Sequence, residues 1–285
     1  MEEKVLKNQS DKFRLNLRQR TIGKITGASC ILALLVISGY MIDGENININ
    51  LEAKNQAPDL EHLFGTDWLG RDMLLRTLKG LVLSLGVGII AAFFSTVIAL
   101  VLSLLSSWNK TADNIVTWLI DLFLSVPHIV TLILISFAAG GGFRGIVIGL
   151  ALTHWPSLAR LLRAEILQLK TAKYVWVSKQ MDKSRLWIAG HHFLPHLVPH
   201  LFVGFILLFP HAILHEAAIT FLGFGLSTET PAIGIILSES MKYLSTGLWW
   251  LALFPGLSLL LMVILFDMLG RNIRKLIDPF QGQKI

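Results

Sequence analysis

Three histidines carry the clearest chemical signal in the sequence. His211 and His215 stand four residues apart in the run PHAILHEAAITFLGFG, and His154 lies in the separate run LALTHWPSLAR. Residues four apart share one helix face, with Cβ atoms about 5–6 Å from each other, and imidazole is a ligand for nickel, copper and zinc. We predict that these histidines line a metal translocation path, with His154 facing the pair across a pore. The alternative is that they are neutral packing residues bonded to backbone carbonyls.

Other polar residues in apolar segments are predicted to have structural roles. Asp121 is costly in lipid and must face protein or water, so we expect a structural or interfacial partner for it rather than a substrate. His128 follows two turns later on the same face, beyond the kink expected at Pro127. Four further histidines in or beside a basic segment are expected to be solvated or to pack, rather than to bind metal: His191, His192, His196 and His200.

The sequence lacks the motifs of an enzyme. His215 and Glu216 begin a zinc-protease pattern, but Ile219 stands where the second ligand is required. No phosphate-binding loop is present, because the Gly23-Lys24 pair lacks the upstream glycine and the following Ser or Thr. The single Cys30 excludes a disulfide framework. We expect no catalytic residue and no cofactor on this chain, so any ATP must be used by another subunit.

The composition indicates a membrane protein. Of 285 residues, 53% are apolar and only 15% are charged, with a mean hydropathy of +0.62. Soluble domains carry about 25% charged residues. A span needs about 20 mostly apolar residues, and the first candidate lacks a signal-peptidase site, so it is read as a retained helix. Six stretches qualify as spans: 25–42, 81–106, 115–139, 145–162, 197–222 and 248–269.

The basic residues predict the orientation. If the amino terminus is cytoplasmic, 19 of the 25 Lys and Arg residues fall on the inner side and 6 on the outer side. This bias favours two cytoplasmic termini. That orientation requires an even number of spans, and six satisfies it. Seven of the inner basic residues lie in segment 160–196, which is longer than a turn needs and predicts a cytoplasmic partner.

These observations predict an all-α membrane protein with six transmembrane helices. The parts are a cytoplasmic tail (1–24), a first helix (25–42), an extracytoplasmic loop (43–80), a five-helix core (81–270) with a cytoplasmic loop at 171–196, and a second cytoplasmic tail (271–285).

Three sequence runs resemble one family. HLFGTDWLGRDMLLRTLKGLVLSL (62–85) is similar to the Gly-Thr-Asp-x-x-Gly-Arg-Asp signature of ABC-importer permeases for dipeptides, oligopeptides and nickel. ALTHWPSLARLLRAEIL (151–167) and EAAITFLGFGLSTETP (216–231) resemble two later family segments, and the likeness covers about residues 62–280. It implies the type I importer architecture in a bacterial inner membrane. The implied partners are a second related permease, two cytoplasmic ATPases and an extracytoplasmic binding protein.

The resemblance also assigns a coupling loop and an outer surface. Segment 174–195 would fit a groove on an ATPase. Asp182 stands where the family has glycine, a position that Asp sometimes tolerates in the left-handed conformation. In the outer loop, Asp67, Arg71 and Asp72 either brace the loop through ion pairs or touch the binding protein. The positions that match the family's coupling pattern are Tyr174, Val175, Ser184, Ile188, His192, Leu194 and Pro195.

The histidines decide the expected cargo. His154, His211 and His215 resemble the nickel-importer branch, whereas peptide permeases have apolar residues leading into the Glu-Ala-Ala segment. We therefore expect Ni²⁺, free or chelated, as the substrate. The first alternative is the same machine carrying di- or oligopeptides. The second is an ion-coupled secondary transporter, against which the long basic inner loop argues.

Overall fold

Long helices dominate the computed structural model, which describes residues 17–42, 48–227 and 230–277. Five described helices are long and apolar enough to cross a membrane, and a bent pair makes a sixth crossing if it is counted as one span. No strand occurs in the described ranges. The long helices are α2 (Leu17–Tyr40), α3 (Met73–Ser106), the bent pair α4 (Lys110–Ser125) and α5 (His128–Ala138), α6 (Gly142–Leu169), α9 (Leu194–Phe221) and α11 (Trp250–Ile277).

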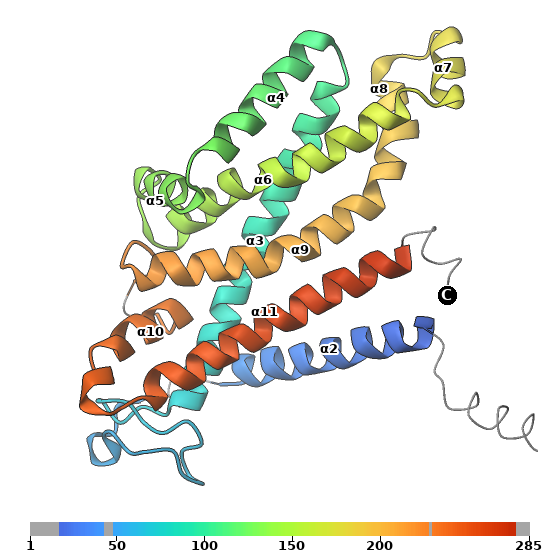
Figure 1. Cartoon of the computed structure of the whole chain (residues 1–285). Coiled ribbons are helices and arrows are strands. Elements are labelled where there is room, and N and C mark those ends of the chain that lie inside the picture. Colours follow the sequence, from blue (N-terminus) through green and yellow to red (C-terminus); the bar gives the residue numbers. More distant parts are fainter. Residues whose placement is uncertain (1–16, 43–47, 228–229, 278–285) are drawn as a thin grey trace, which may run out of the picture.

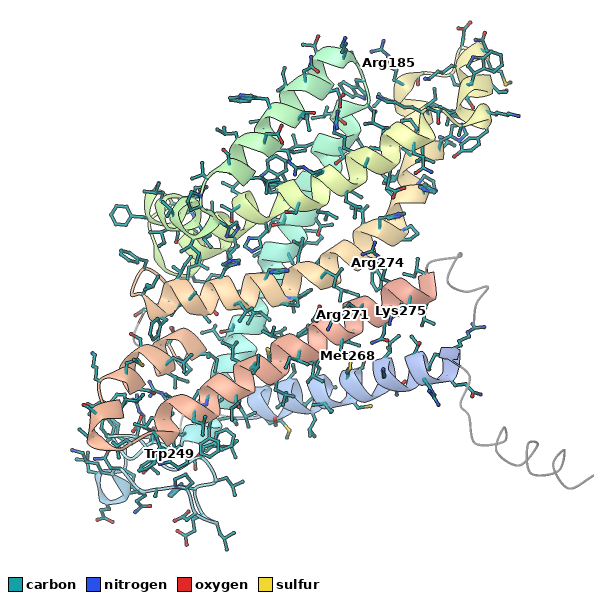
Figure 2. The ribbon with its side chains drawn as sticks, viewed as in Figure 1. Arg185, Trp249, Met268, Arg271, Arg274 and Lys275 are labelled. Atoms are coloured by element: carbon teal, nitrogen blue, oxygen red, sulfur yellow. The ribbon has the colours of Figure 1, made fainter. Side chains whose placement is uncertain are left out.

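Shorter helices lie at the two ends of the bundle. Figure 1 shows α7 (Lys173–Gln180) and α8 (Arg185–Ile188) at one end, together with the start of α2 and the end of α11. The loop after α2 and α10 (Ile233–Met241) lie at the opposite end. In Figure 2, the basic end of α11 (Arg271, Arg274, Lys275) lies on the same side as Arg185. This placement agrees with an even number of crossings and a basic cytoplasmic side. The remaining short elements are the 3₁₀ helices η2 (Leu51–Ala53) and η4 (Leu244–Thr246) and the π-helix η3 (Ala189–Phe193).

The helix ends differ from the apolar stretches in the sequence. α2 begins eight residues before the expected span at 25, and α11 continues to Ile277, inside the expected tail. α3 begins within the expected outer loop, because the Asp72 side chain accepts hydrogen bonds from the amides of Leu74 and Leu75 and caps the helix. The helices are therefore longer than the apolar stretches, and the first turns of α3 are buried at Met73, Arg76 and Thr77. The tail segments 1–16 and 278–285 lie outside the described residues.

The third expected span is a broken helix rather than one continuous span. α4 and α5 meet at 101°. Val126 is extended (φ −93°, ψ 141°) and Pro127 precedes the first residue of α5. Proline disfavours the helical conformation of the residue before it and lacks an N–H for the helix ladder. The kink expected at Pro127 is therefore a bend of 101° between two helices. This bend places His128 at the first position of α5.

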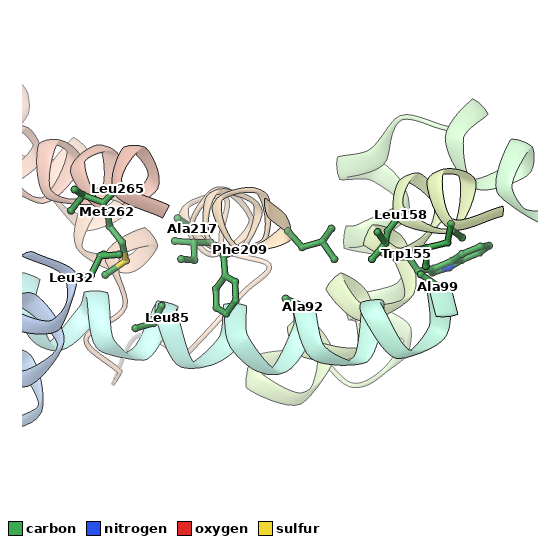
Figure 3. Close-up of a cluster of buried hydrophobic side chains, with 14 of the residues drawn as sticks. Leu32, Leu85, Ala92, Ala99, Trp155, Leu158, Phe209, Ala217, Met262 and Leu265 are labelled. Atoms are coloured by element: carbon green, nitrogen blue, oxygen red, sulfur yellow. The ribbon is translucent and has the colours of Figure 1, made fainter. Parts of the chain in front are cut away.

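α3 is the central helix and packs on α2, α4, α6, α9, α10 and α11. Small residues in transmembrane helices let neighbouring backbones approach closely. Figure 3 shows Leu85, Ala92 and Ala99 of α3 facing the side chains of neighbouring helices, among them Phe209 of α9. The Ser95 hydroxyl also donates to the Ala151 carbonyl of α6 at 3.1 Å. The buried small residues of α3 are Gly80, Ser84, Gly88, Ala91, Ala92, Ser95, Ala99, Ser103 and Ser106.

The outer loop is fixed to the bundle by buried charges. Asp67 is fully buried and accepts hydrogen bonds from Arg71 Nε (2.7 Å) and a terminal nitrogen of Arg76 (3.1 Å). Arg76, 2% exposed, also donates to Glu239 of α10 at 2.5 Å. The Trp68 ring stacks on Tyr243 with centroids 4.5 Å apart. These contacts tie the loop to α3 and α10, so the loop and the outer ends of both helices form one unit.

Two glycines of α3 provide a test of close packing. We expect Gly80→Ala to lower the melting temperature of the purified protein, because a Cβ there would lie 2.5 Å from the Pro231 carbonyl oxygen. Gly86→Ala is the matched control, since nothing lies within 4 Å of a Cβ there. That change should raise stability by about 0.5–1 kcal/mol through helix propensity. Equal shifts of the melting temperature for the two variants in detergent would show that α3 is not closely packed at Gly80.

The buried ion pairs of the outer loop give a second prediction. Asp67→Asn keeps the side-chain size but removes the charge that balances Arg71 and Arg76, which should cost about 3 kcal/mol. Glu61→Gln, in the same loop but exposed, should have no effect. Thermal unfolding monitored by size-exclusion chromatography checks both variants. A loop that serves only as a partner surface would leave the melting temperature of Asp67→Asn unchanged.

Candidate functional site

Three imidazole rings meet where α5, α6 and α9 converge. His128 comes from the start of α5, His154 from α6 and His215 from α9, and one nitrogen of each lies within 4.8 Å of the others. The ring centroids are 4.4–5.2 Å apart. His154 is buried and the other two are half-buried. The arrangement brings three metal-binding side chains from three separate helices to one point.

The hydrogen bonds of His154 determine which of its nitrogens is free. Nδ1 lies 3.0 Å from the Leu150 carbonyl oxygen. A carbonyl only accepts, so Nδ1 carries the proton and donates it. Nε2 of the neutral ring is then left with its lone pair, and it faces Nδ1 of His215 at 3.2 Å. A metal-binding histidine usually donates its second nitrogen to a carbonyl or carboxylate in this way.

His128 has an unsatisfied nitrogen at the same place. Its Nδ1 is buried and has no hydrogen-bond partner among the described residues. Buried polar atoms are nearly always paired. Two ligand atoms about 2.1 Å from one ion lie about 3.0–3.4 Å apart at angles of about 90–109°. The His154 and His215 nitrogens are 3.2 Å apart, which is a hydrogen-bond distance as well as the spacing of two ligands, so a transition-metal ion bound by the cluster would replace this hydrogen bond.

The structure assembles a different trio from the one expected from the sequence. His154 and His215 meet, but the third ring is His128, while His211 is exposed one turn before His215 and is not in the cluster. Helical spacing correctly placed two histidines on one side of α9, but it contained no information about α5. The signal for His128 in the sequence was its position directly after Pro127, where the helix changes direction.

Asp121 has the structural role that was expected. It pairs with Arg160 of α6 at 2.7 Å, on the exposed side of α4. A second bridge between the same two helices joins Asp113 to Arg163 at 2.6 Å. Both carboxylates thus fix α4 against α6 and neither reaches the histidine cluster.

The expected coupling loop folds into two short helices and a turn. Val175 and Ile188 are buried and anchor α7 and α8, while Tyr174 is half exposed and lies against the His192 ring. Asp182 has φ +54°, the left-handed conformation for which glycine is usually required. The sequence departure at this position therefore keeps the same backbone.

Other positions that match the family's coupling pattern make local contacts at the end of this loop. The Ser184 hydroxyl accepts a hydrogen bond from the Trp187 amide and caps α8. His192 Nε2 lies 2.7 Å from the Ser178 hydroxyl and joins α7 to the π-helix η3. Leu194 and Pro195 open α9, where proline is favoured because a first-turn residue needs no N–H partner. The exposed side chains of this loop are mixed: apolar Trp176, Val177, Met181 and Leu186 lie among charged residues, which are Lys173, Lys179, Asp182, Lys183 and Arg185.

The three outer-loop residues act within the loop. Asp67 and Arg71 belong to the buried ion-pair network, and Asp72 caps α3 and accepts from His62 Nδ1 at 2.8 Å. All three side chains therefore make bracing contacts of the kind considered from the sequence.

The chain has relatives of known type. Residues 84–279 match the family described as "Binding-protein-dependent transport system inner membrane component". A putative peptide transport system permease protein of Brucella suis is 31% identical over 265 residues, which cover 92% of this chain and 89% of the relative.

Two relatives are named dipeptide transport system permease protein DppC. The Bacillus subtilis protein is 28% identical over 87% of this chain and 78% of its own length. The protein of Alkalihalophilus pseudofirmus is 31% identical over 90% of this chain and 84% of its own length. These names refer to peptide transport and not to nickel, so they do not support the nickel branch suggested by the sequence resemblance. The chain belongs to the permease family of binding-protein-dependent ABC importers, as a multi-pass component of the inner membrane that works with ATPase and substrate-binding partners.

Proposed function

We propose that this permease subunit passes a transition-metal ion, Ni²⁺ free or chelated, across the inner membrane. The observation that carries the proposal is the convergence of His128, His154 and His215, whose ligand nitrogens lie within 4.8 Å of one another. Ionisable side chains at membrane depth usually line a pathway. Nickel is the proposed cargo and not a resident cofactor. A site of three neutral ligands suits a cargo ion, because such a site binds the ion without trapping it.

The proposed assembly has four further subunits. A second related permease supplies the other half of the pathway, two ATPases bind and hydrolyse ATP, and an extracytoplasmic protein delivers the substrate. This chain would form no covalent bond with its cargo. Movement of segment 174–195 on an ATPase would rock the helices, and α5 would carry His128 toward or away from His154 and His215. The break at Pro127 provides a place for that motion.

Di- and oligopeptides are the second candidate cargo. The relatives named above favour it, since they are peptide and dipeptide permeases that cover most of this chain. In this case the three histidines would be packing residues. The two candidates differ in what they require of the rings: a metal needs their nitrogens, whereas packing needs only their volume.

Nickel dependence of ATP hydrolysis separates the two cargoes. In the reconstituted importer with its binding protein, we expect Ni²⁺ or a nickel chelate to stimulate ATPase activity, and His154→Ala with His215→Ala to reduce nickel uptake at limiting concentration at least tenfold. His128→Ala should reduce it similarly, since one ligand of three is worth more than 1.4 kcal/mol, or tenfold in affinity.

Two comparisons make this test specific. His211→Ala removes an exposed histidine from the same helix and should affect uptake less than His215→Ala. His154→Phe keeps the ring volume without a nitrogen and should be as impaired as the alanine variant. Stimulation by dipeptides alone, together with normal function of His154→Phe, would establish the peptide candidate instead.

The coupling segment gives a further prediction. Because Asp182 occupies the left-handed region, Asp182→Gly should preserve or raise substrate-stimulated ATPase activity. Asp182→Val should lower it, because a β-branched residue in this conformation costs about 1–2 kcal/mol or more. Co-purification of the ATPase with each variant is the control for assembly. Equal activity of the two variants would show that the left-handed turn is not needed for coupling.

A further inference from the structure

An ion pair lies on the exposed surface of two membrane-spanning helices. Asp121 of α4 and Arg160 of α6 are 2.7 Å apart, and their side chains are 61% and 57% exposed. α4 begins at Lys110, at the end of the bundle that holds α7 and α8 (Figure 1). Asp121 follows Lys110 by eleven residues, which is about 16 Å at the helical rise. The hydrocarbon core of a bilayer is about 30 Å thick, so this exposed carboxylate is at membrane depth.

The exposed polar residues of α4 lie in one row. Asn114, Trp118, Asp121 and Ser125 are all exposed, and they follow one another at spacings of four, three and four residues. Residues three and four apart lie above one another on a helix. The row therefore runs along the helix from its first turn to its last residue, and three of its four members are polar.

α6 exposes a matching row beside Arg160. Ser157, Arg160, Ala164 and Gln168 are exposed at spacings of three, four and four residues, and none has a large apolar side chain. The row begins three residues after His154 and continues toward the last residue of α6. Because the Asp121–Arg160 ion pair joins the two rows, they form one surface. We call this surface the polar stripe, and its polar members are Asn114, Asp121, Ser125, Ser157, Arg160 and Gln168.

Lipid is an unfavourable neighbour for the polar stripe. Charged and polar side chains are costly in hydrocarbon, where nothing solvates them. α3 shows what an exposed surface suited to lipid looks like in this chain, because its exposed residues are all apolar. They are Ile89, Ile90, Phe93, Phe94, Val97 and Val101. The exposed surface of α4 and α6 differs from that of α3, so it requires a different neighbour.

Apolar residues flank the polar stripe on both helices. Ile115 and Leu122 are exposed next to the row of α4, and Leu161 and Leu167 next to the row of α6. The stripe is thus a narrow polar track with apolar margins. Ionisable residues in transmembrane helices usually pair with one another and face the interior of a bundle or a water-filled cavity. Water is the neighbour that solvates the exposed halves of both charged groups of the ion pair.

We infer that the polar stripe lines the water-filled part of the translocation pathway between the three-histidine cluster and the cytoplasm. The stripe starts one turn after His154 and ends near the cytoplasmic end of α6, so it continues the path from the cluster. For the pathway this inference rests on the function proposed above. It does not depend on the choice between nickel and peptide as the cargo.

The ion pair keeps this part of the pathway electrically balanced. Arg160 alone would repel a cation that leaves the histidines, and Asp121 alone would retain it. As a pair they present both signs to the water at a separation of 2.7 Å. A cation or a zwitterionic peptide then passes a polar surface that has no net charge.

Cysteine accessibility in the assembled importer tests the inference. Cys30 is replaced by Ser, and the probe is a membrane-impermeant cationic methanethiosulfonate reagent applied to lipid nanodiscs. This reagent attacks the thiolate, which forms in water and not in hydrocarbon, so Ser157→Cys should be labelled roughly tenfold or more faster than Val97→Cys. Val97 is the lipid-facing control. It lies nine residues from the cytoplasmic end of α3, whereas Ser157 lies twelve from that of α6, so depth does not favour Ser157→Cys.

The charge of the reagent reports on the ion pair. Asp121→Asn leaves Arg160 unbalanced, so in the Ser157→Cys chain it should shift the labelling rates toward an anionic reagent and away from the cationic one, by roughly twofold or more. An unchanged ratio of the two rates would place the ion pair outside the water at Ser157 and would contradict the inference. Size-exclusion profiles verify that each variant is assembled.

Uptake after labelling separates the pathway from a water-filled crevice elsewhere. Labelled Ser157→Cys should lose uptake of the cargo relative to the same variant before labelling, whereas treated Val97→Cys should not. Labelling of Ser157→Cys as slow as that of Val97→Cys, or fast labelling with unchanged uptake, would overturn the inference. Blocked dipeptide uptake in an importer that does not respond to Ni²⁺ would support the polar stripe and reject nickel as the cargo. Nickel-stimulated ATPase activity without labelling of Ser157→Cys would do the reverse.

Discussion

The close approach of α3 to α6 and α9 is the constraint on which the rest of the structure depends. In lipid, helix association gives little hydrophobic free energy. Close packing and interhelical hydrogen bonds must therefore supply the free energy that holds the helices together. The small residues of α3, such as Gly88 and Ser95, allow both neighbours to lie against one helix. This packing sets the relative position of α6 and α9, and with it the meeting of His154 and His215.

Polar groups inside the bundle are satisfied in two different ways. At the outer loop, Asp67 and Glu239 of α10 are balanced by Arg71 and Arg76, and these ion pairs fix the loop to α10. In the helical core, His154 Nδ1 donates to the Leu150 carbonyl oxygen. His154 Nε2 faces Nδ1 of His215. His128 Nδ1 has no hydrogen-bond partner among the described residues. The charged groups are paired with one another, whereas the three histidines bring one nitrogen each to within 4.8 Å of the others, which makes the histidines and not the ion pairs the candidate metal ligands.

Family membership and cargo rest on different parts of the chain. Relatives named for peptides align with most of this chain and with most of their own length, and the family model matches residues 84–279. The histidines of α5, α6 and α9 favour a metal ion as the cargo. The names of the relatives favour a peptide instead.

The sequence by itself determined the all-α class, the apolar segments, the orientation from basic residues and the family from motifs such as 62–85. Each of these is a property of consecutive residues, and so it can be read along the chain. The sequence also placed His154 and His215 among the candidate ligands. Only the tertiary structure decided that their third partner is His128 and not His211, and that His196 and His200 face Glu165. Helical periodicity specifies which residues share a face, but the direction of that face depends on helix crossings and on the turn at Pro127, which are fixed by packing between segments far apart in the chain.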